Sequence, residues 1–126
     1  MKLGILNTTI ATTNGCYEIH ELSLEQAREI VGKAMKADGI DSAVGHQASS
    51  DILTVLLGVD VPMNRQQFAQ QPQQGAIVLK LNGRIPEGAV LTEVSEIESI
   101  GYSLKLMVRL PDACNQPSKL MDLFEL

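Results

Sequence analysis

The amino-acid sequence predicts a single α/β domain in which a mixed central sheet is flanked by helices. The first observation is size, because 126 residues with 44% hydrophobic and 20% charged side chains suit one globular domain. The second is that strand-like and helix-like segments interleave along the chain. We find no repeat and no interior linker, and therefore expect one domain over residues 1–110 and a tail over residues 111–126.

The N-terminal third predicts two strands and a helix. We expect strands at Lys2–Asn7 and Tyr17–Ile19. Ser23 and Gln26 have the spacing of a capping box, so a helix should begin there and end at Asp38–Gly39. The apolar side chains between these limits recur at helical spacing, at Ala27, Ile30, Val31 and Ala34.

A brief strand at Ile40–Val44 should lead into a second helix just after Gly45–His46. Hydrogen-bond acceptors at Ser49–Asp51 suit the free N–H groups of a first helical turn. Gly58 stands where a C-terminal glycine belongs, and Pro62 prevents any continuation.

The C-terminal half begins with a glutamine-rich run, Gln66–Gln74, which we interpret as a loop or edge segment. Ala76–Leu81 is the strongest expected strand, and Asn82–Gly88 is a turn-rich connection. A short helix is expected over Thr92–Ser99 with the threonine as its cap. Tyr102–Leu110 alternates as a final strand with two distinct faces.

Composition excludes several functions. Ten basic against 15 acidic residues give a net charge of −5, which argues against coating duplex DNA but permits a small anion in a local pocket. Aromatic residues at 3% are too few for a base-stacking platform. Two cysteines make neither a disulfide framework nor a zinc set. No membrane-length apolar run and no signal peptide are evident, so we expect a cytoplasmic protein with no membrane contact.

The candidate functional residues suit acid–base chemistry without a metal or cofactor. His46 lies between Gly45 and a serine-rich helix start, where an anion is favoured and an imidazole can donate a proton. Arg65 and Arg84 suit phosphate recognition, and Glu87 can orient a reacting group. Alternatives stay open: His46 as a capping or packing residue, and each arginine as a surface residue.

Ligands in α/β sheets commonly lie outside the carboxyl ends of strands, where Asn7 and Thr8 follow the first strand. No nucleotide-binding loop, zinc motif or paired metal-binding carboxylates are present. Such a set of groups suits RNA, which carries its own nucleophile in the 2′-hydroxyl.

Four motifs in order resemble a known family. They are Leu6–Thr8 closing the first strand, Ser42–His46, Leu57–Arg65 and Arg84–Gly88. Together they resemble the small viral and prokaryotic ring nucleases that include the type III anti-CRISPR protein of archaeal viruses. The resemblance covers about Lys2 to Leu110.

This resemblance implies a homodimer that binds cyclic tetra-adenylate at its two-fold axis and cleaves it. It implies that His46 is the general acid, that Glu87 and Arg84 support the reacting group, and that Arg65 holds phosphate or adenylate. The remaining implied ligand-binding residues are Asn7, Thr8, Gly45, Ser49 and Asn64.

Two alternatives remain. The chain could bind a cyclic oligonucleotide as a sponge or sensor without turning it over. The apolar tail also carries its own alternatives: a helix docked on its own domain, a partner contact through residues 117–126, or disorder.

Overall fold

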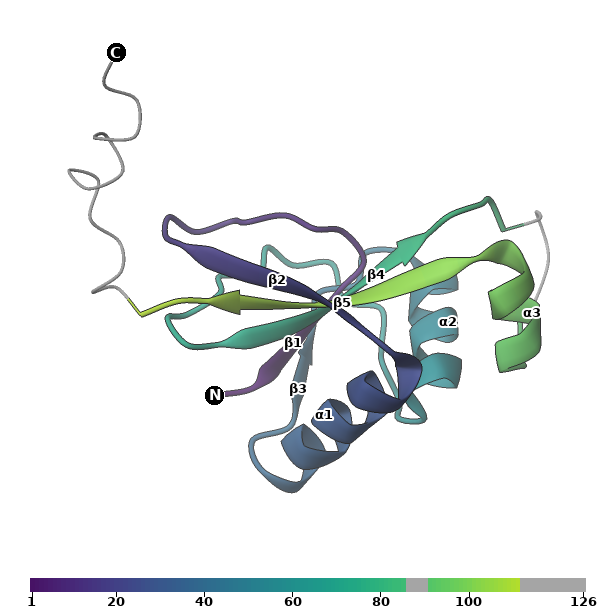
Figure 1. Cartoon of the computed structure of the whole chain (residues 1–126), viewed down its shortest axis with the longest axis horizontal. Helices are drawn as coiled ribbons and strands as arrows, with labels where there is room; N and C mark the ends of the chain where they lie inside the picture. The colour runs from purple at the N-terminus through teal and green to yellow at the C-terminus, as the bar shows by residue number, and fades with distance from the viewer. Residues whose placement is uncertain (86–90, 112–126) are drawn as a thin grey trace, which may run out of the picture.

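The computed structural model describes residues 1–85 and 91–111 and confirms the α/β prediction (Figure 1). Three helices are described: α1 (Leu24–Lys36), α2 (Gln47–Leu57) and α3 (Val94–Ile100). They accompany five strands: β1 (Leu3–Leu6), β2 (Tyr17–Leu22), β3 (Ile40–Ser42), β4 (Gly75–Leu81) and β5 (Tyr102–Arg109).

The five strands form one mixed sheet in the order β2-β5-β4-β1-β3. Strand β1 runs parallel to both β3 and β4, whereas β5 runs antiparallel to both β4 and β2. The carboxyl ends of β1, β3 and β4 therefore meet at one edge of the sheet. Polar side chains that follow these strands are brought together there.

All three helices cover the same face of the sheet. Their buried side chains share one core cluster with Ile77 and Leu79 of β4, whereas the alternate residues Ala76 and Val78 belong to a second cluster. Successive side chains of a strand point to opposite faces, so the second cluster lies on the other side of the sheet. The prediction of flanking helices is correct for one face only.

The glutamine-rich segment covers the second face. Phe68 is buried there with Leu6 and Met107, and Gln70 and Gln74 are also buried. The segment has no regular secondary structure, as expected, but it is a packed covering and not a surface loop. Its glutamine amides donate hydrogen bonds to backbone carbonyls of β5 and of the residue before β1.

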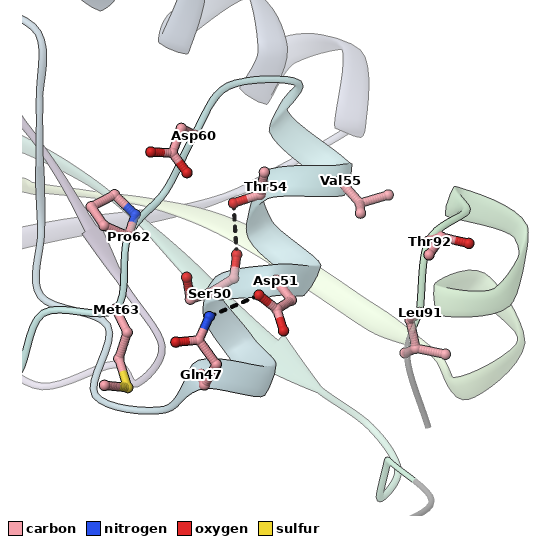
Figure 2. Close-up of a pocket in the computed structure, with 10 residues that line it drawn as sticks. All are labelled: Gln47, Ser50, Asp51, Thr54, Val55, Asp60, Pro62, Met63, Leu91 and Thr92. Atoms are coloured by element: carbon pink, nitrogen blue, oxygen red, sulfur yellow. Dashed lines mark hydrogen bonds between the residues drawn. The ribbon is translucent and has the colours of Figure 1, made fainter. Parts of the chain in front are cut away.

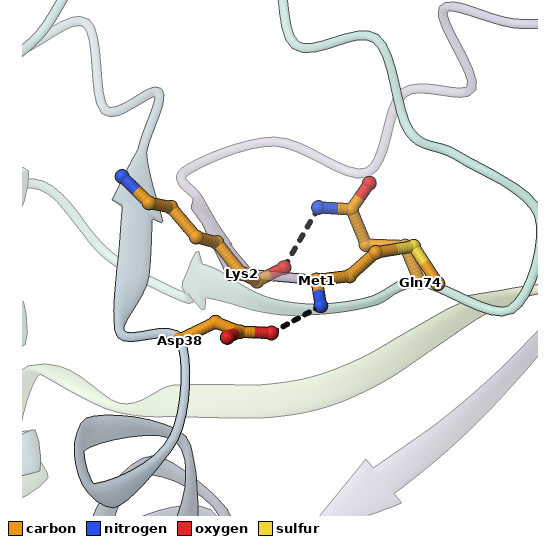
Figure 3. Close-up of polar contacts among 4 residues, drawn as sticks. All are labelled: Met1, Lys2, Asp38 and Gln74. Carbon is orange, nitrogen blue, oxygen red and sulfur yellow. Dashed lines mark hydrogen bonds and ion pairs between the residues drawn. The ribbon is translucent and has the colours of Figure 1, made fainter.

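Two such bonds fasten the segment to the sheet. Gln74 Nε2 donates to the Lys2 carbonyl at 2.7 Å, and Gln70 Nε2 donates to the Met107 carbonyl at 2.9 Å. Figure 3 shows Gln74 beside the start of β1, where the Met1 ammonium contacts the exposed Asp38 carboxylate. The hydrogen bond from this ammonium, followed by its positive charge, lowers the pKa of Asp38 below its ordinary value.

Local sequence signals located most element ends. Both bonds of the Ser23–Gln26 capping box are present, and Gly58 ends α2 in a left-handed conformation with φ 72°. The prediction of Thr92 as the cap is wrong, because Glu93 occupies the N-cap of α3. Among the described residues, the Thr92 hydroxyl hydrogen-bonds the Glu96 carboxylate, at 3.4 Å.

Strand limits also differ. Strands β1 and β4 differ from the expected ranges by one residue at an end or at both ends. Strand β2 continues to Leu22 because all of Tyr17–Leu22 pairs with β5, which itself ends at Arg109. Strand β3 ends at Ser42, and Val44 forms an isolated bridge with Met63. The tail beyond Pro111 lies outside the described residues. No helix in the described part of the chain is long and apolar enough to cross a membrane.

Candidate functional site

His46 occupies the N-cap position of α2 with its side chain exposed. The imidazole makes no capping hydrogen bond to the helix. The capping and packing interpretations of this histidine are therefore wrong. An exposed imidazole at the positive end of a helix can meet an anion and transfer a proton to it.

Arg65 lies beside this histidine although it is 19 residues away in sequence. Its Nε donates to the Gly45 carbonyl at 3.0 Å, which places the guanidinium next to the residue that precedes His46. Asn64 joins the same group, since its Nδ2 donates to the Ser42 carbonyl at 2.9 Å. The structure thus places Asn64 and Arg65 next to the segment that leads into His46.

Ser49 lies three residues after His46 in the first turn of α2, on the same side of the helix. It is half-buried. Its neighbour Ser50 does not supply an acceptor to the helix start, because its buried hydroxyl donates to the Val61 carbonyl instead. Of these two serines, Ser49 is therefore the better placed to contact a ligand at the helix N-terminus.

Asn7 and Thr8 follow β1 at the same edge of the sheet. They line a hollow of about 520 Å³ together with Thr9, Lys80 and Lys105, which we name the lysine hollow. Lys105 pairs with Val78, and Lys80 lies two residues further along β4, so both lysines are on the face opposite the helices. Two ammonium groups beside an amide and two hydroxyls form an anion-binding set.

Sequence reasoning missed both lysines. Neither lysine carries a local signal, because each is an ordinary polar residue within its strand. Only the register of β4 against β5 shows that the two positions share one face.

A smaller hollow of about 230 Å³ adjoins the lysine hollow at Thr8. Its walls combine apolar side chains, those of Leu6, Ile10, Ala43 and Phe68, with the polar side chains of Thr8, Thr12 and Gln67. Gln66 also lines it and belongs to the segment that carries Arg65. The small hollow therefore extends from the lysine hollow toward the Asn64–Arg65 segment.

A third hollow, of about 550 Å³, lies between α2 and the residues that precede α3 (Figure 2). Its charged side chains are carboxylates, Asp51 and Asp60. Gln47 Nε2 donates to Asp51 at 2.8 Å, whereas no described residue pairs with Asp60. Because two carboxylates repel a phosphate, the lysine hollow is the better anion site of the two.

The remaining predicted residues are less closely connected. Arg84 is exposed just after β4, and no hydrogen bond joins its side chain to other residues in 1–85 or 91–111. Glu87 lies outside the described residues. Within the described ranges, no three His, Cys, Asp or Glu side chains are grouped to hold a metal ion.

The model of the STIV B116-like family matches residues 3–104, which is most of the chain. The chain belongs to the STIV B116-like family. This B116-like protein is 37% identical over 111 residues to ORF117 of Acidianus two-tailed virus, a match that covers 86% of the chain and 93% of the viral protein. It is also 30% identical over 111 residues to YddF of Bacillus subtilis, covering 87% and 99% of the two chains.

The solved structure of B116 from Sulfolobus turreted icosahedral virus has the same fold. The TM-score is 0.73 at 18% identity, with 85% of this chain and 98% of the viral chain covered. The comparison supports the mixed five-stranded sheet with helices as the family architecture. The hollows and side-chain contacts described above are those of this chain, because the match to the viral structure shows the shared fold alone.

Proposed function

We propose that this B116-like protein is a metal-independent ring nuclease that cleaves cyclic tetra-adenylate. The products would be linear adenylates that end in a 2′,3′-cyclic phosphate, and their formation would switch off type III CRISPR signalling in the cytoplasm. The observation that carries the proposal is the exposed, uncapped His46 beside Arg65, at the sheet edge that also holds the lysine hollow.

The chemistry follows from the groups available. A ribose 2′-oxygen attacks the adjacent phosphorus, and its proton passes to solvent. The bond from phosphorus to the 5′-oxygen breaks, and His46 donates a proton to that leaving oxygen. Arg65 stabilises the negative charge that develops on the phosphoryl oxygens. Arg84 and Glu87 are assigned to the same reacting group through the family resemblance.

The charges of the hollows support this assignment. A cyclic tetranucleotide carries only four phosphates, which Lys80, Lys105 and Arg65 from two chains can meet while the net charge stays at −5 per chain. The small hollow next to them has both apolar and hydrogen-bonding side chains in its walls and a volume of about 230 Å³, which suits a nucleobase. A two-fold homodimer would present two His46 side chains to opposite phosphates of the ring.

The direct test is to incubate purified protein with cyclic tetra-adenylate and EDTA and to identify products by mass spectrometry. We expect cleavage by the wild type and a rate about 10²–10⁴-fold lower for His46→Ala, with binding retained. His20→Ala is the matched control, because His20 is exposed on β2 and contacts Glu18 at 3.2 Å. It should cleave at the wild-type rate.

Two results would overturn the mechanism: no cleavage by the wild type, or full activity of His46→Ala. If wild-type protein binds the ring tightly and returns it unchanged after long incubation, the protein is a sponge or sensor instead. Parallel assays with cyclic tri- and hexa-adenylate determine the ring size that it accepts.

A further inference from the structure

We propose that Gln66 is a positioning residue that holds Arg65 and His46 at a fixed separation. Its side-chain amide joins Pro62–Gln66, the segment that carries Arg65, to Asp41–Gly45, the segment that leads directly into His46. We call these two segments the brace. The catalytic consequence rests on the proposed function, whereas the mechanical role of the brace can be tested without it.

The Gln66 amide uses both of its donor hydrogens within the brace. Nε2 lies 2.8 Å from the Asp41 carboxylate and 2.7 Å from the Ser42 carbonyl. The two acceptors belong to adjacent residues of β3, so this one side chain attaches the segment of Arg65 to the edge strand of the sheet. Glutamate at this position would bring a third acceptor in place of the two donors.

Further bonds complete the brace around Ser42. Its carbonyl also accepts from Asn64 Nδ2 at 2.9 Å, and its hydroxyl donates to the Pro62 carbonyl at 2.6 Å. The Asn64 backbone N–H donates to the Val44 carbonyl at 2.8 Å. Asn64 therefore has a structural role in addition to the ligand contact that the family resemblance implies.

The side-chain bonds matter because little regular structure joins the two segments. Strand β3 has three residues and lies at the edge of the sheet. The one bridge between the segments is Val44 with Met63. Without the Gln66 amide, the brace loses its two hydrogen bonds to Asp41 and Ser42. The segment that carries Arg65 is then held by fewer bonds and can shift more easily relative to β3.

A shift of this kind would move Arg65, which stabilises the negative charge, away from His46, which donates the proton. His46 follows Gly45 directly, and Arg65 is attached to the Gly45 carbonyl at 3.0 Å. Displacement of a catalytic group by about 1 Å can lower a rate about 10²-fold while ligand binding continues. The brace should therefore affect the rate of cleavage more than the affinity for the ring.

The test compares Gln66→Met with Gln71→Met in the full chain. Gln71 is the matched control because its exposed amide donates only to the Ala69 carbonyl, two residues away, at 3.1 Å. The first readout is solvent exchange of the Arg65 Nε–H signal in ¹⁵N NMR spectra, assigned by its loss in Arg65→Lys. We expect exchange at least about fivefold faster in Gln66→Met than in wild type, and unchanged in the control.

The second readout is single-turnover cleavage of cyclic tetra-adenylate, with binding measured separately. At ring concentrations that saturate each variant, Gln66→Met should cleave about 10–100-fold more slowly than wild type with an unchanged pH profile, because His46 still supplies the proton. Unchanged exchange would overturn the brace. Faster exchange with a wild-type rate would overturn the positioning role. If the wild type does not cleave, the proposed function fails, and exchange alone decides whether the brace exists.

Discussion

Gly4 lies under the ring of Phe68, so replacing it with alanine should destabilise the sheet face opposite the helices. A Cβ at this position would lie 2.5 Å from Cζ and 2.8 Å from Cε2 of Phe68. The ring would have to retreat by about 1 Å to reach ordinary contact distance. Phe68 is only 6% exposed and packs in the cluster that contains Leu6 and Met107. We expect Gly4→Ala to lower the free energy of unfolding by about 1–3 kcal/mol, as overpacked cores do.

A double-mutant cycle isolates this contact. Phe68→Ala should cost about 3–5 kcal/mol, because a buried aromatic side chain is removed. With the ring absent, Gly4→Ala should add less than about 0.5 kcal/mol, since its Cβ then enters empty space. The free energies come from urea denaturation followed by circular dichroism at one protein concentration, so that any oligomer contributes equally.

The control is Gly32→Ala, because an added Cβ there would meet nothing within 4 Å on the exposed side of α1. This substitution should stabilise the protein by about 0.5–1 kcal/mol, as alanine has the higher helix propensity. A clash with Phe68 is excluded if Gly4→Ala is as stable as wild type, or if Gly4→Ala lowers the free energy of unfolding by the same amount with and without Phe68.

Three further predictions concern single charged or titrating side chains. Arg28 Nε donates to the Leu56 carbonyl in the last turn of α2 at 2.7 Å, so Arg28→Ala should cost about 1 kcal/mol in the same urea assay, and a neutral result would exclude this cap. Lys105→Gln should weaken binding of cyclic tetra-adenylate and reduce its dependence on salt concentration, as calorimetry at several ionic strengths can show; an unchanged dependence would remove Lys105 from the site. Burial, and next the Glu98 carboxylate, raise the pKa of Tyr102 above its ordinary value of 10.0 against an opposing effect of Arg28. The contribution of this tyrosine to stability is therefore complete below pH 10 and is lost as pH rises through the folded-state pKa. Glu98→Gln should lower the Tyr102 pKa in an ultraviolet absorbance titration, and no change would exclude that carboxylate as a cause.

Elements with strong local signals were predictable from sequence. The capping box at Ser23 and the apolar spacing after it located α1, and the continuous apolar run located β4. Weak signals led to errors: Thr92 was assigned as a cap although Glu93 has that position, and β2 was given half of its length. The missing half of β2 is His20–Leu22, which has two polar residues in succession and no alternating pattern, and it becomes a strand because β5 pairs with it.

The candidate site was predictable in part for a similar reason. His46 and Asn7 each follow an expected strand or precede an expected helix, so local patterns located them at the ligand-binding edge. Lys80 and Lys105 carry no local signal, because an outward lysine is ordinary in any strand. The hydrogen bonds of Gln66 were equally unpredictable, because this residue lies in a glutamine-rich segment whose sequence indicates a loop.

The sequence by itself determined the α/β class, the order of most elements and the position of an exposed histidine at a helix start, since capping and periodicity act over a few residues. The tertiary structure alone decided which distant groups meet. The pairing of β4 with β5 placed two lysines on one face, and a glutamine-rich segment became the cover of the second sheet face. These outcomes depend on strand register and on which backbone groups remain unpaired. Neither can be inferred from the pattern of neighbouring residues.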